Sequence, residues 1–353
     1  MISTKTVKLN PGYPDENSLK EAAQILARGG LVVIPTETVY GIAANMLNEP
    51  AMRRLSKIKS RPENKPFSLH IDEKEKVEEF AKDIPPAAYK LMERFWPGPL
   101  TLILKSKNNG TVGIRLPDDE IARRVIALSG VPVVCPSANL AGKPAPIIFS
   151  EAIADLNGLV DFAIDAGATR MQAESTIVDF DTTPPKILRA GAIKKEEIEA
   201  VLGKKAVLFV CTGNSCRSVM AKAILEKSLA QQKRRDVEVL SAGIMFLQGT
   251  GATEETKAVL ARDGLDVSTH RAQRVTKEMI KKSDLILVME KVHEEKILEI
   301  APEVKNRLFL LKEFAKIDNS DLNISDPIGK PLDDYEKTFW VIKEAVERVA
   351  KII

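Results

Sequence analysis

The chain has 353 residues, a hydrophobic content of 44% and 52 basic against 49 acidic side chains. Its length predicts at least two domains, and the balanced charge argues against a surface built for stable RNA or DNA binding. No apolar stretch approaches the roughly 20 residues of a membrane span, and three scattered cysteines and three histidines form neither a disulfide framework nor a zinc site, so we expect no metal centre and a cytoplasmic setting.

Strands and helices alternate through the first half of the chain. The pattern predicts strands at 31–34, 100–105, 131–135, 175–180 and 186–189, and helices at 49–60, 73–82 and 192–203. Because the last helix is charged and ends at Gly203, we place the first domain at residues 1–203.

The alternation restarts in the second half. Here the pattern predicts strands at 206–210, 237–241, 285–289 and 308–310, and helices at 218–231, 253–263, 293–299 and 333–352. Strands that alternate with helices over short connections are typical of a doubly wound parallel sheet. Residues 204–353 are therefore expected to form a second α/β domain.

Hydroxyls and cations follow the apolar strands of the first half. They lie in Pro35–Gly41 (PTETVYG), in Lys59–Pro62, at Arg115, in Pro136–Asn139 (PSAN) and in Arg189–Gly191. Such groups at strand ends fit an anionic ligand, most simply a nucleotide. The P-loop pattern of Walker-type sites is absent from the sequence. For any single Arg or Lys, an ordinary surface charge explains the residue equally well.

Seven motifs in fixed order give the first half a resemblance. They are PTETVYG, K-S-R-P-x-x-K-P-x-x-x-H, FWPGPLTLIL, GIRLP, PSAN, STIVD and ILRAGAI. Over roughly residues 10–195 the chain resembles the threonylcarbamoyl-AMP synthase family, whose domain is called YrdC-like. The resemblance implies a twisted, curved α/β fold with a positively lined cavity. It also implies formation of threonylcarbamoyl-AMP and pyrophosphate from L-threonine, bicarbonate and ATP, with magnesium on the phosphates, as the first step of tRNA threonylcarbamoyladenosine formation. We expect the tRNA itself to be met by other tRNA-modification proteins.

The same resemblance implies two sets of site residues. For ATP these are Lys59, Arg61, Lys65, Thr111, Asn139 and Arg189. For threonine and its carbamate they are Thr38, His70, Arg115, Ser137 and Ser175. Ala141 and Ile147–Ile148 replace hydroxyl residues of the family pattern, which puts one ATP contact in doubt, and Lys65 replaces the more common Asn. His70 could also be a buried strand histidine.

A cysteine loop opens the second half. The apolar run Val207–Val210 leads into Cys211-Thr212-Gly213-Asn214-Ser215-Cys216-Arg217-Ser218. A buried strand, a loop of small residues and a helix start together form an anion cradle of backbone N–H groups. Arg217 can hold two phosphoryl oxygens, and the positive potential should lower the thiol pKa of Cys211 and make it a nucleophile. The alternative is a small buried cysteine beside a surface arginine.

Hydrolysis through a cysteinyl-phosphate also requires a proton donor for the leaving group. Asp326 is the candidate, because the following Pro327 fixes a turn that can hold the carboxyl over a pocket. The expected reaction is hydrolysis of a phosphomonoester or a phosphoramidate.

Residues 206–353 resemble the low-molecular-weight protein tyrosine phosphatase family. The matching stretches are VLFVCTGNSCRS, SAG, GLDVSTHRAQ, DLILVM and DPIGKPLDDYEKT. The resemblance implies Cys211 as nucleophile, Arg217 as phosphate clamp and Asp326 as general acid and then base. It assigns support of the phosphate loop to Thr212, Gly213, Asn214, Ser215, Cys216 and Ser218, with Asn214 and Ser218 lowering the pKa of the thiol.

Two departures from the family pattern concern the substrate. Ser215 stands where tyrosine-specific members usually carry an apolar β-branched residue, and the usual aromatic after Asp326-Pro327 is missing. We therefore favour a phosphoarginine protein over a phosphotyrosine protein as substrate. Val219 replaces the family's usual proline, which should affect only the rigidity of the helix start. Cys216 is either the partner of a protective disulfide with Cys211 or a packed small residue.

The motifs together predict a bifunctional enzyme. The alternative is that one half is a regulatory or nucleotide/RNA-binding module and only the other is catalytic. Neither the oligomeric state nor communication between the two sites follows from the sequence.

Overall fold

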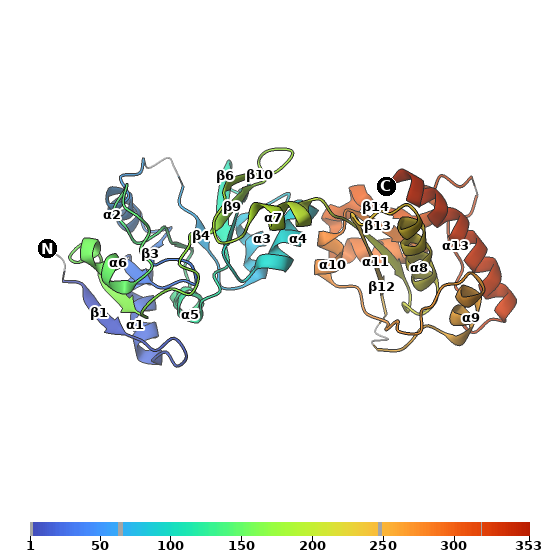
Figure 1. The fold of residues 1–353 in the computed structure, drawn as a ribbon, viewed down its shortest axis with the longest axis horizontal. Coiled ribbons are helices and arrows are strands. Elements are labelled where there is room, and N and C mark those ends of the chain that lie inside the picture. Colours follow the sequence, from blue (N-terminus) through green and yellow to red (C-terminus); the bar gives the residue numbers. More distant parts are fainter. Residues whose placement is uncertain (1–2, 63–65, 246–248, 319) are drawn as a thin grey trace. The chain divides into compact units, whose positions relative to one another are not determined.

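The computed structural model describes residues 3–62, 66–245, 249–318 and 320–353. The chain divides into two compact units, Met1–Glu199 and Ala200–Ile353 (Figure 1). Within the described ranges, no helix is both long enough and apolar enough to cross a membrane.

The first unit is built on one mixed sheet. Its strands are β1 (Lys5–Lys8), β2 (Val32–Ile34), β3 (Gly41–Asn45), β4 (Leu69–His70), β5 (Leu100–Lys105), β6 (Thr111–Arg115), β7 (Val133–Val134), β8 (Phe162–Asp165), β9 (Thr176–Asp179) and β10 (Lys186–Arg189). They lie in the order β1-β8-β2-β3-β7-β4-β6-β5-β9-β10, which combines parallel and antiparallel pairs. The mixed sheet and its helices confirm the expected α/β class of this half.

Helices cover the sheet of the first unit. They are α1 (Glu16–Ala27), α2 (Glu49–Ile58), α3 (Val77–Phe80), α4 (Pro86–Phe95), α5 (Glu120–Ser129), α6 (Phe149–Leu156) and α7 (Lys195–Leu202), with a 3₁₀ turn, η1, at Lys74–Lys76. Helices α1 and α5 pack against each other through Leu19, Leu26, Ile121 and Val125, all of which are fully buried. This apolar layer covers one face of the sheet.

The helix predicted over 73–82 is wrong in extent. The structure has the 3₁₀ turn at Lys74–Lys76 and then only one helical turn, because Ala81 is extended and pairs with Ser106 in an isolated bridge. The strand predicted over 131–135 is likewise shortened to Val133–Val134.

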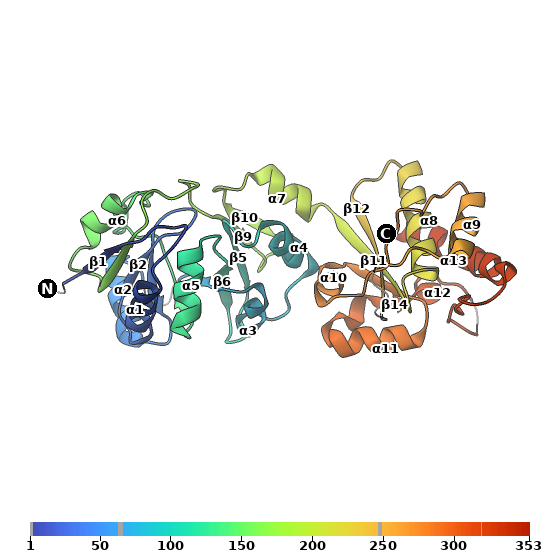
Figure 2. The same cartoon turned by 90° about the horizontal axis from the view of Figure 1, so that it is seen from below.

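The second unit has a parallel sheet in the order β12-β11-β13-β14. Its elements are β11 (Lys205–Cys211), α8 (Arg217–Gln231), β12 (Val237–Gly243), α9 (Glu254–Arg262), α10 (Lys277–Lys282), β13 (Leu285–Val288), α11 (Lys291–Ile300), η2 (Pro302–Arg307), β14 (Leu308–Leu310), α12 (Leu311–Phe314) and α13 (Leu332–Ile352). Figure 2 shows α8 and α9 on one side of this sheet and α11 on the other, as the prediction of a doubly wound sheet requires.

The sequence of β11 explains why both faces of this sheet are covered. Val207 and Phe209 pack into the apolar cluster under α8 and α13, whereas Leu208 and Val210 pack into the cluster under α10 and α11. A strand that is buried on both faces has a continuous run of apolar residues in its sequence. The run ends at Cys211, so the strand delivers that residue to the carboxyl edge of the sheet.

Gly243, at the end of β12, lies against the loop that follows Cys211. A Cβ at this position would come within 2.8 Å of the Thr212 carbonyl oxygen and within 2.9 Å of the Asn214 amide nitrogen. Because both are backbone atoms of the loop, neither can move aside without changing the loop.

Gly243→Ala should therefore destabilise the second unit by about 1–3 kcal/mol, the usual range for overpacking. Urea unfolding followed by circular dichroism measures this change. Gly251→Ala is the matched control, because the nearest atoms to its added Cβ lie 4.0 Å away. Equal stability of the two variants would contradict the close approach.

Candidate active sites

A cavity of about 390 Å³ opens in the first unit. Eight of the residues expected from the sequence line it: Lys59, Arg61, His70, Thr111, Arg115, Ser137, Ser175 and Arg189. They come from strands β4, β6 and β10, from the segments that follow α2 and β7, and from the residue just before β9. The sheet therefore brings together groups that are more than 100 residues apart in the chain.

Arg115 forms the buried end of this group. Its Nη2 donates to Glu37 Oε1 at 2.7 Å and to Thr38 Oγ1 at 2.8 Å. The Arg115 side chain is 6% exposed and that of Glu37 is fully buried. A buried charge pair needs such good geometry to offset the loss of hydration. Thr38 is thus placed to hold Arg115, and it is not among the residues that line the cavity.

His70 lies beside Arg115 as a neutral ring. Burial, reinforced by the Arg115 charge, lowers the pKa of His70 to about 3. Its Nδ1 lies 3.4 Å from the Ser68 carbonyl oxygen, while no described group bonds to its Nε2. Glu37 Oε2 and Arg115 Nε are likewise buried without a described partner. Unsatisfied buried polar atoms of this kind are uncommon and are groups that a polar ligand can satisfy.

Lys59 organises the PSAN turn. Its Nζ donates to Asn139 Oδ1 and to the Asn139 carbonyl, both at 2.8 Å, and to the Ser137 carbonyl at 3.0 Å. These bonds use the three donors of the ammonium group. Asn139 therefore contacts Lys59 and is not among the residues that line the cavity.

Ser175 and Arg189 form the opposite wall. Arg189 donates from Nη2 to Ser175 Oγ at 3.0 Å and from Nε to the Ser175 carbonyl at 2.9 Å. Ser175 Oγ also lies 3.0 Å from Thr101 Oγ1. A Cβ on Gly191 would lie 2.1 Å from the Glu174 carbonyl oxygen, so only glycine allows this turn to approach.

The cavity also contains residues that the sequence analysis missed, among them Thr36, Thr101, Cys135 and Glu174. Cys135 is buried, and burial raises its thiol pKa to about 12. Thr36 lies within the PTETVYG motif and Cys135 directly precedes PSAN. Their positions in or next to these motifs were the sequence signal that could have identified them as cavity residues. The predicted Lys65 lies outside the described residues.

In the second unit, the loop between β11 and α8 turns its carbonyls outward. The carbonyl of Cys211 accepts from Ile244 N at 3.0 Å and that of Thr212 from Met245 N at 2.9 Å. The carbonyl of Asn214 accepts from His270 Nε2 at 2.7 Å. With its carbonyls held from outside, the loop presents N–H groups to its interior, which is the geometry of an anion site.

Two donors reach the Cys211 sulfur. Asn214 N lies 3.3 Å from Sγ and Ser218 Oγ lies 3.0 Å from it. Asn214 Oδ1 accepts from Gln273 N, so its Nδ2 donates to Ser218 Oγ at 2.9 Å and leaves the Ser218 hydroxyl proton for the sulfur. Asn214 adopts a left-handed backbone with φ of 55°, which asparagine tolerates. Donors in these positions would stabilise a negative charge on the sulfur.

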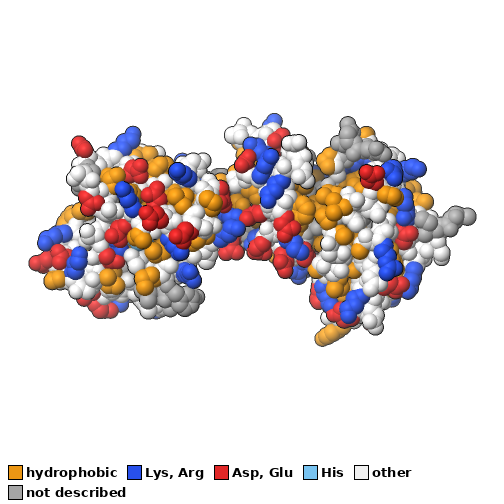
Figure 3. Space-filling model, turned by 180° about the vertical axis from the view of Figure 1, so that it is seen from behind, with side chains coloured by type: hydrophobic (Ala, Val, Ile, Leu, Met, Phe, Trp, Pro, Cys, Tyr) orange, Lys and Arg blue, Asp and Glu red, His pale blue; other side chains and the backbone are white. Residues whose placement is uncertain are grey.

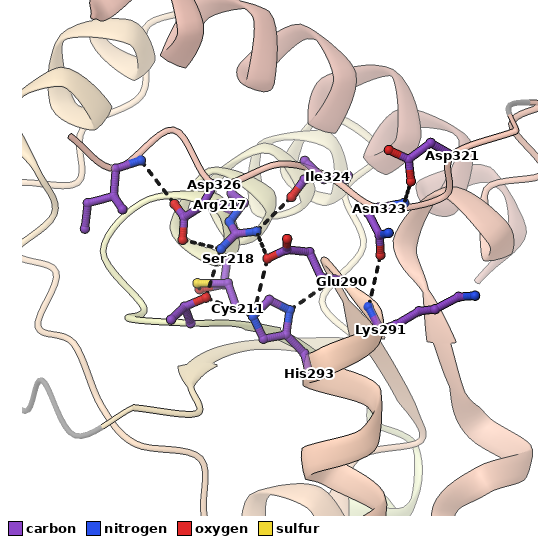
Figure 4. Close-up of polar contacts among 12 residues, drawn as sticks. Cys211, Arg217, Ser218, Glu290, Lys291, His293, Asp321, Asn323, Ile324 and Asp326 are labelled. Atoms are coloured by element: carbon purple, nitrogen blue, oxygen red, sulfur yellow. Dashed lines mark hydrogen bonds and ion pairs between the residues drawn. The ribbon is translucent and has the colours of Figure 1, made fainter. Parts of the chain in front are cut away.

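Arg217 is fully buried at the start of α8 and joins the loop to two other segments (Figure 4). It forms ion pairs with Glu290 and Asp326, and its Nη1 donates to the Ile324 carbonyl at 2.7 Å. Cys211, Arg217 and Asp326, widely separated in the sequence, therefore converge at one edge of the sheet.

Glu290 and His293 belong to this group but were not predicted. Burial, reinforced by Arg217, lowers the pKa of His293 to about 4, so the ring is neutral at pH 7. Its Nδ1 accepts from Glu290 N at 3.0 Å, and the proton is therefore on Nε2, which donates to Thr212 Oγ1 at 3.0 Å. The signal for them in the sequence was their place directly after the apolar run of β13.

Cys216 and Ser215 lie deeper in the loop. The three cysteines are free thiols. Cys216 Sγ lies 3.6 Å from Thr253 Oγ1 and 3.9 Å from the Tyr335 hydroxyl, in a packed environment. Ser215 is nearly buried and its Oγ lies 3.6 Å from Cys216 Sγ.

Among the described residues, no group of three or more His, Cys, Asp or Glu side chains is arranged to hold a metal ion.

Each half of the chain matches a known family. Residues 24–191 match the family described as telomere recombination, which groups the Sua5, YciO and YrdC proteins. Residues 206–353 match the low molecular weight phosphotyrosine protein phosphatase family.

Curated relatives divide in the same way. The threonylcarbamoyl-AMP synthase of Pyrococcus abyssi is 40% identical over 216 residues, which is 59% of this chain and 64% of the relative. The putative threonylcarbamoyl-AMP synthase of Methanocaldococcus jannaschii is 35% identical over 52% of this chain and 92% of its own length. The protein-arginine-phosphatase of Geobacillus stearothermophilus is 37% identical over 145 residues, which is 41% of this chain and 93% of the relative.

A solved structure adds to these matches. The crystal structure of P. abyssi Sua5 complexed with L-threonine aligns with a TM-score of 0.54 and 28% identity, over 87% of this chain and 99% of that one. The chain spans 64% and 58% of the length of the P. abyssi and Bacillus subtilis synthases that it matches. The chain therefore belongs, through its first half, to the threonylcarbamoyl-AMP synthase family and, through its second half, to the low-molecular-weight protein phosphatase family.

Proposed function

We propose that the first half forms threonylcarbamoyl-AMP from L-threonine, bicarbonate and ATP, for tRNA threonylcarbamoyladenosine formation. The observation that carries this proposal is the cavity, which Lys59, Arg61, Arg115 and Arg189 line together with three serines. Four cationic side chains can bind both the triphosphate of ATP and the carboxylate of threonine. In the proposed reaction, the threonine nitrogen attacks the carbon of bicarbonate or of its activated form; from bicarbonate, an amine proton and the hydroxyl group leave as water. The resulting carbamate oxygen then attacks the α-phosphate, and pyrophosphate leaves.

The assignment of single residues follows the family motifs in which they stand. We propose that Lys59, Arg61, Lys65, Thr111, Asn139 and Arg189 serve ATP, and that Thr38, His70, Arg115, Ser137 and Ser175 serve threonine. Within the second set, Thr38 acts through Arg115, to which it is hydrogen-bonded. Such a site accelerates the reaction by positioning and by charge neutralisation.

Magnesium would enter as part of the Mg–ATP substrate. Among the described lining residues Glu174 is the one carboxylate, and it forms an ion pair with Arg189. Because Mg²⁺ commonly binds through substrate phosphates with few protein ligands, this sparse lining fits a metal carried by the nucleotide.

We propose that the second half hydrolyses phosphorylated proteins. The supporting observation is that Cys211, Arg217 and Asp326 meet around a loop with outward carbonyls. The Cys211 thiolate would attack phosphorus while Asp326 protonates the leaving atom. Asp326 would then deprotonate the water that cleaves the cysteinyl-phosphate.

For the substrate we propose phosphoarginine rather than phosphotyrosine. Ser215 belongs to the cysteine loop, and a serine hydroxyl can accept a hydrogen bond from a guanidinium N–H. A 37% identical relative is a protein-arginine-phosphatase, which supports the same choice.

The two domains are proposed at residues 1–203 and 204–353, since the division between compact units falls inside the single helix α7. On the face shown in Figure 3, basic and acidic side chains are interspersed. This supports the proposal that tRNA is bound by partner proteins of the modification pathway. The free thiols support a reducing cytoplasm as the setting.

The synthase proposal predicts threonine-dependent release of pyrophosphate from ATP by the full chain. Arg61→Met should lower kcat/KM for ATP by roughly 10-fold or more, because a charge-assisted contact contributes about 1.5–3 kcal/mol. The control is Arg53→Met, which removes an exposed arginine of α2 that pairs with Glu49. No threonine-dependent release from the pure wild-type protein would contradict the synthase proposal.

The pH dependence of ATP binding tests Lys59. Burial lowers the pKa of Lys59 to about 8, with Glu174 opposing and Arg61 reinforcing the shift. The cavity therefore loses positive charge as the pH rises through 8, and ATP should bind roughly a few-fold more weakly at pH 9 than at pH 7.5, as judged from the value of a single partly screened charge. Calorimetric titration measures this, and Lys59→Arg should flatten the dependence. An unchanged dependence in that variant would exclude Lys59 as its source.

The phosphatase proposal predicts that phosphoarginine peptides are hydrolysed with a higher kcat/KM than matched phosphotyrosine peptides. Ser215→Ala should reverse or reduce this preference because it removes the hydroxyl without adding bulk. Cys211→Ser should abolish both activities; activity that survives in that variant would rule out a cysteinyl-phosphate.

A further inference from the structure

The segment that carries Asp326 has no regular secondary structure. Residues 321–330, which we call the acid segment, lie between the end of α12 and the start of α13 without helical or strand hydrogen bonding. Backbone of this kind is positioned only by the side chains and helix ends that satisfy its polar groups. The position of Asp326 therefore depends on the anchors of this segment.

Lys312 is the first anchor. This residue of α12 is 7% exposed, and its Nζ donates to the carbonyl oxygens of Asp321 and Asn323, both at 2.9 Å. A buried ammonium group is stable only where such acceptors surround it. One side chain thus fixes two alternate peptide groups of the acid segment.

Asn323 is the second anchor. Its Oδ1 accepts from Lys291 N at 3.0 Å, which is an N–H group in the first turn of α11 without an acceptor inside the helix. The backbone N–H of Asn323 donates to Asp321 Oδ1 at 2.9 Å. Figure 4 shows Asn323 between Asp321 and Lys291, beside the group that contains Glu290 and His293.

Ile324 completes the attachment on the side of Asp326. Its N–H donates to the Met289 carbonyl at 2.8 Å, and its carbonyl accepts from Arg217 Nη1. Residues 289–293 in turn contact Arg217 through Glu290 and Thr212 through His293. The acid segment and the cysteine loop are therefore both attached to the start of α11.

From these contacts we propose that Asn323 and Lys312 are positioning residues that hold the Asp326 carboxyl over the cysteine loop. The inference rests on the proposed function, in which Asp326 is the general acid. Neither side chain touches the reacting atoms. Both act through the backbone on which Asp326 stands, three residues after Asn323.

The role has a kinetic consequence that ordinary destabilisation lacks. Protonation by a general acid contributes most when the leaving group is a poor one, and it contributes little when the leaving group departs readily as an anion. A displaced Asp326 should therefore lower kcat/KM for phenyl phosphate far more than for p-nitrophenyl phosphate. Loss of folded protein lowers both values by the same factor.

The test measures kcat/KM for these two substrates with full-length variants. Asn323→Ala should raise the ratio of p-nitrophenyl to phenyl phosphate turnover by roughly 10-fold, part of the about 10²–10⁴-fold that a general acid supplies. Asn323→Asp keeps an acceptor for Lys291 N and should restore the wild-type ratio. Lys312→Met should raise the ratio as well. Lys330→Met is the control, since it removes an exposed lysine of the same segment.

Asp326→Asn separates this inference from the proposed function. If this variant leaves the ratio unchanged, Asp326 is not the general acid and both proposals fall. If Asp326→Asn raises the ratio but Asn323→Ala does not, or if Asn323→Ala lowers both values equally, only the positioning role is overturned. Should Lys312→Met fail to fold, the Asn323 pair still decides the outcome.

Discussion

The buried guanidinium of Arg217 is the interaction on which the second unit depends. It sits at the start of α8 and bonds to Thr212 in the cysteine loop, to Glu290 before α11 and to Ile324 and Asp326 in the acid segment. An uncompensated charge at this depth would cost several kcal/mol, so the two carboxylates and the carbonyl stabilise it. These partners lie in the cysteine loop, before α11 and in the acid segment. The guanidinium therefore links the three segments that form the site.

The first unit also contains a buried arginine charge, that of Arg115. Glu37 and Thr38 hold its Nη2 on the protein side, while Nε has no described partner. The guanidinium is thereby oriented before any ligand enters, and the ligand need not supply the energy for that ordering. The two units share the principle that a buried arginine is fixed by acidic partners and retains binding capacity of its own.

The sequence was sufficient for the parts of the structure that follow from local patterns. The apolar run of β11 and the small residues after it predicted both the strand and the anion cradle, since burial on both faces needs such a run. The Asp15 N-cap and the apolar Leu19, Ala22 and Leu26 are also a local signal for α1, although this helix was not among the predicted ones. Long-range partners were different. The contacts of Glu290 with Arg217 and of Lys59 with Asn139 depend on the order of the strands in the sheet, because that order decides which strand ends become neighbours. The local spacing of residues in the sequence does not encode the strand order.

Cys135 has a consequence for the chemistry of the whole chain. Both units place a cysteine near cations, so an anionic alkylating reagent such as iodoacetate is attracted to each. Burial raises the pKa of the Cys135 thiol to about 12 and keeps it protonated, whereas the Cys211 sulfur is the nucleophile in the proposed phosphatase reaction. Because thiols react with such reagents only as thiolates, alkylation becomes selective for the second unit. One reagent would thus modify the proposed phosphatase site and leave the proposed synthase site unmodified.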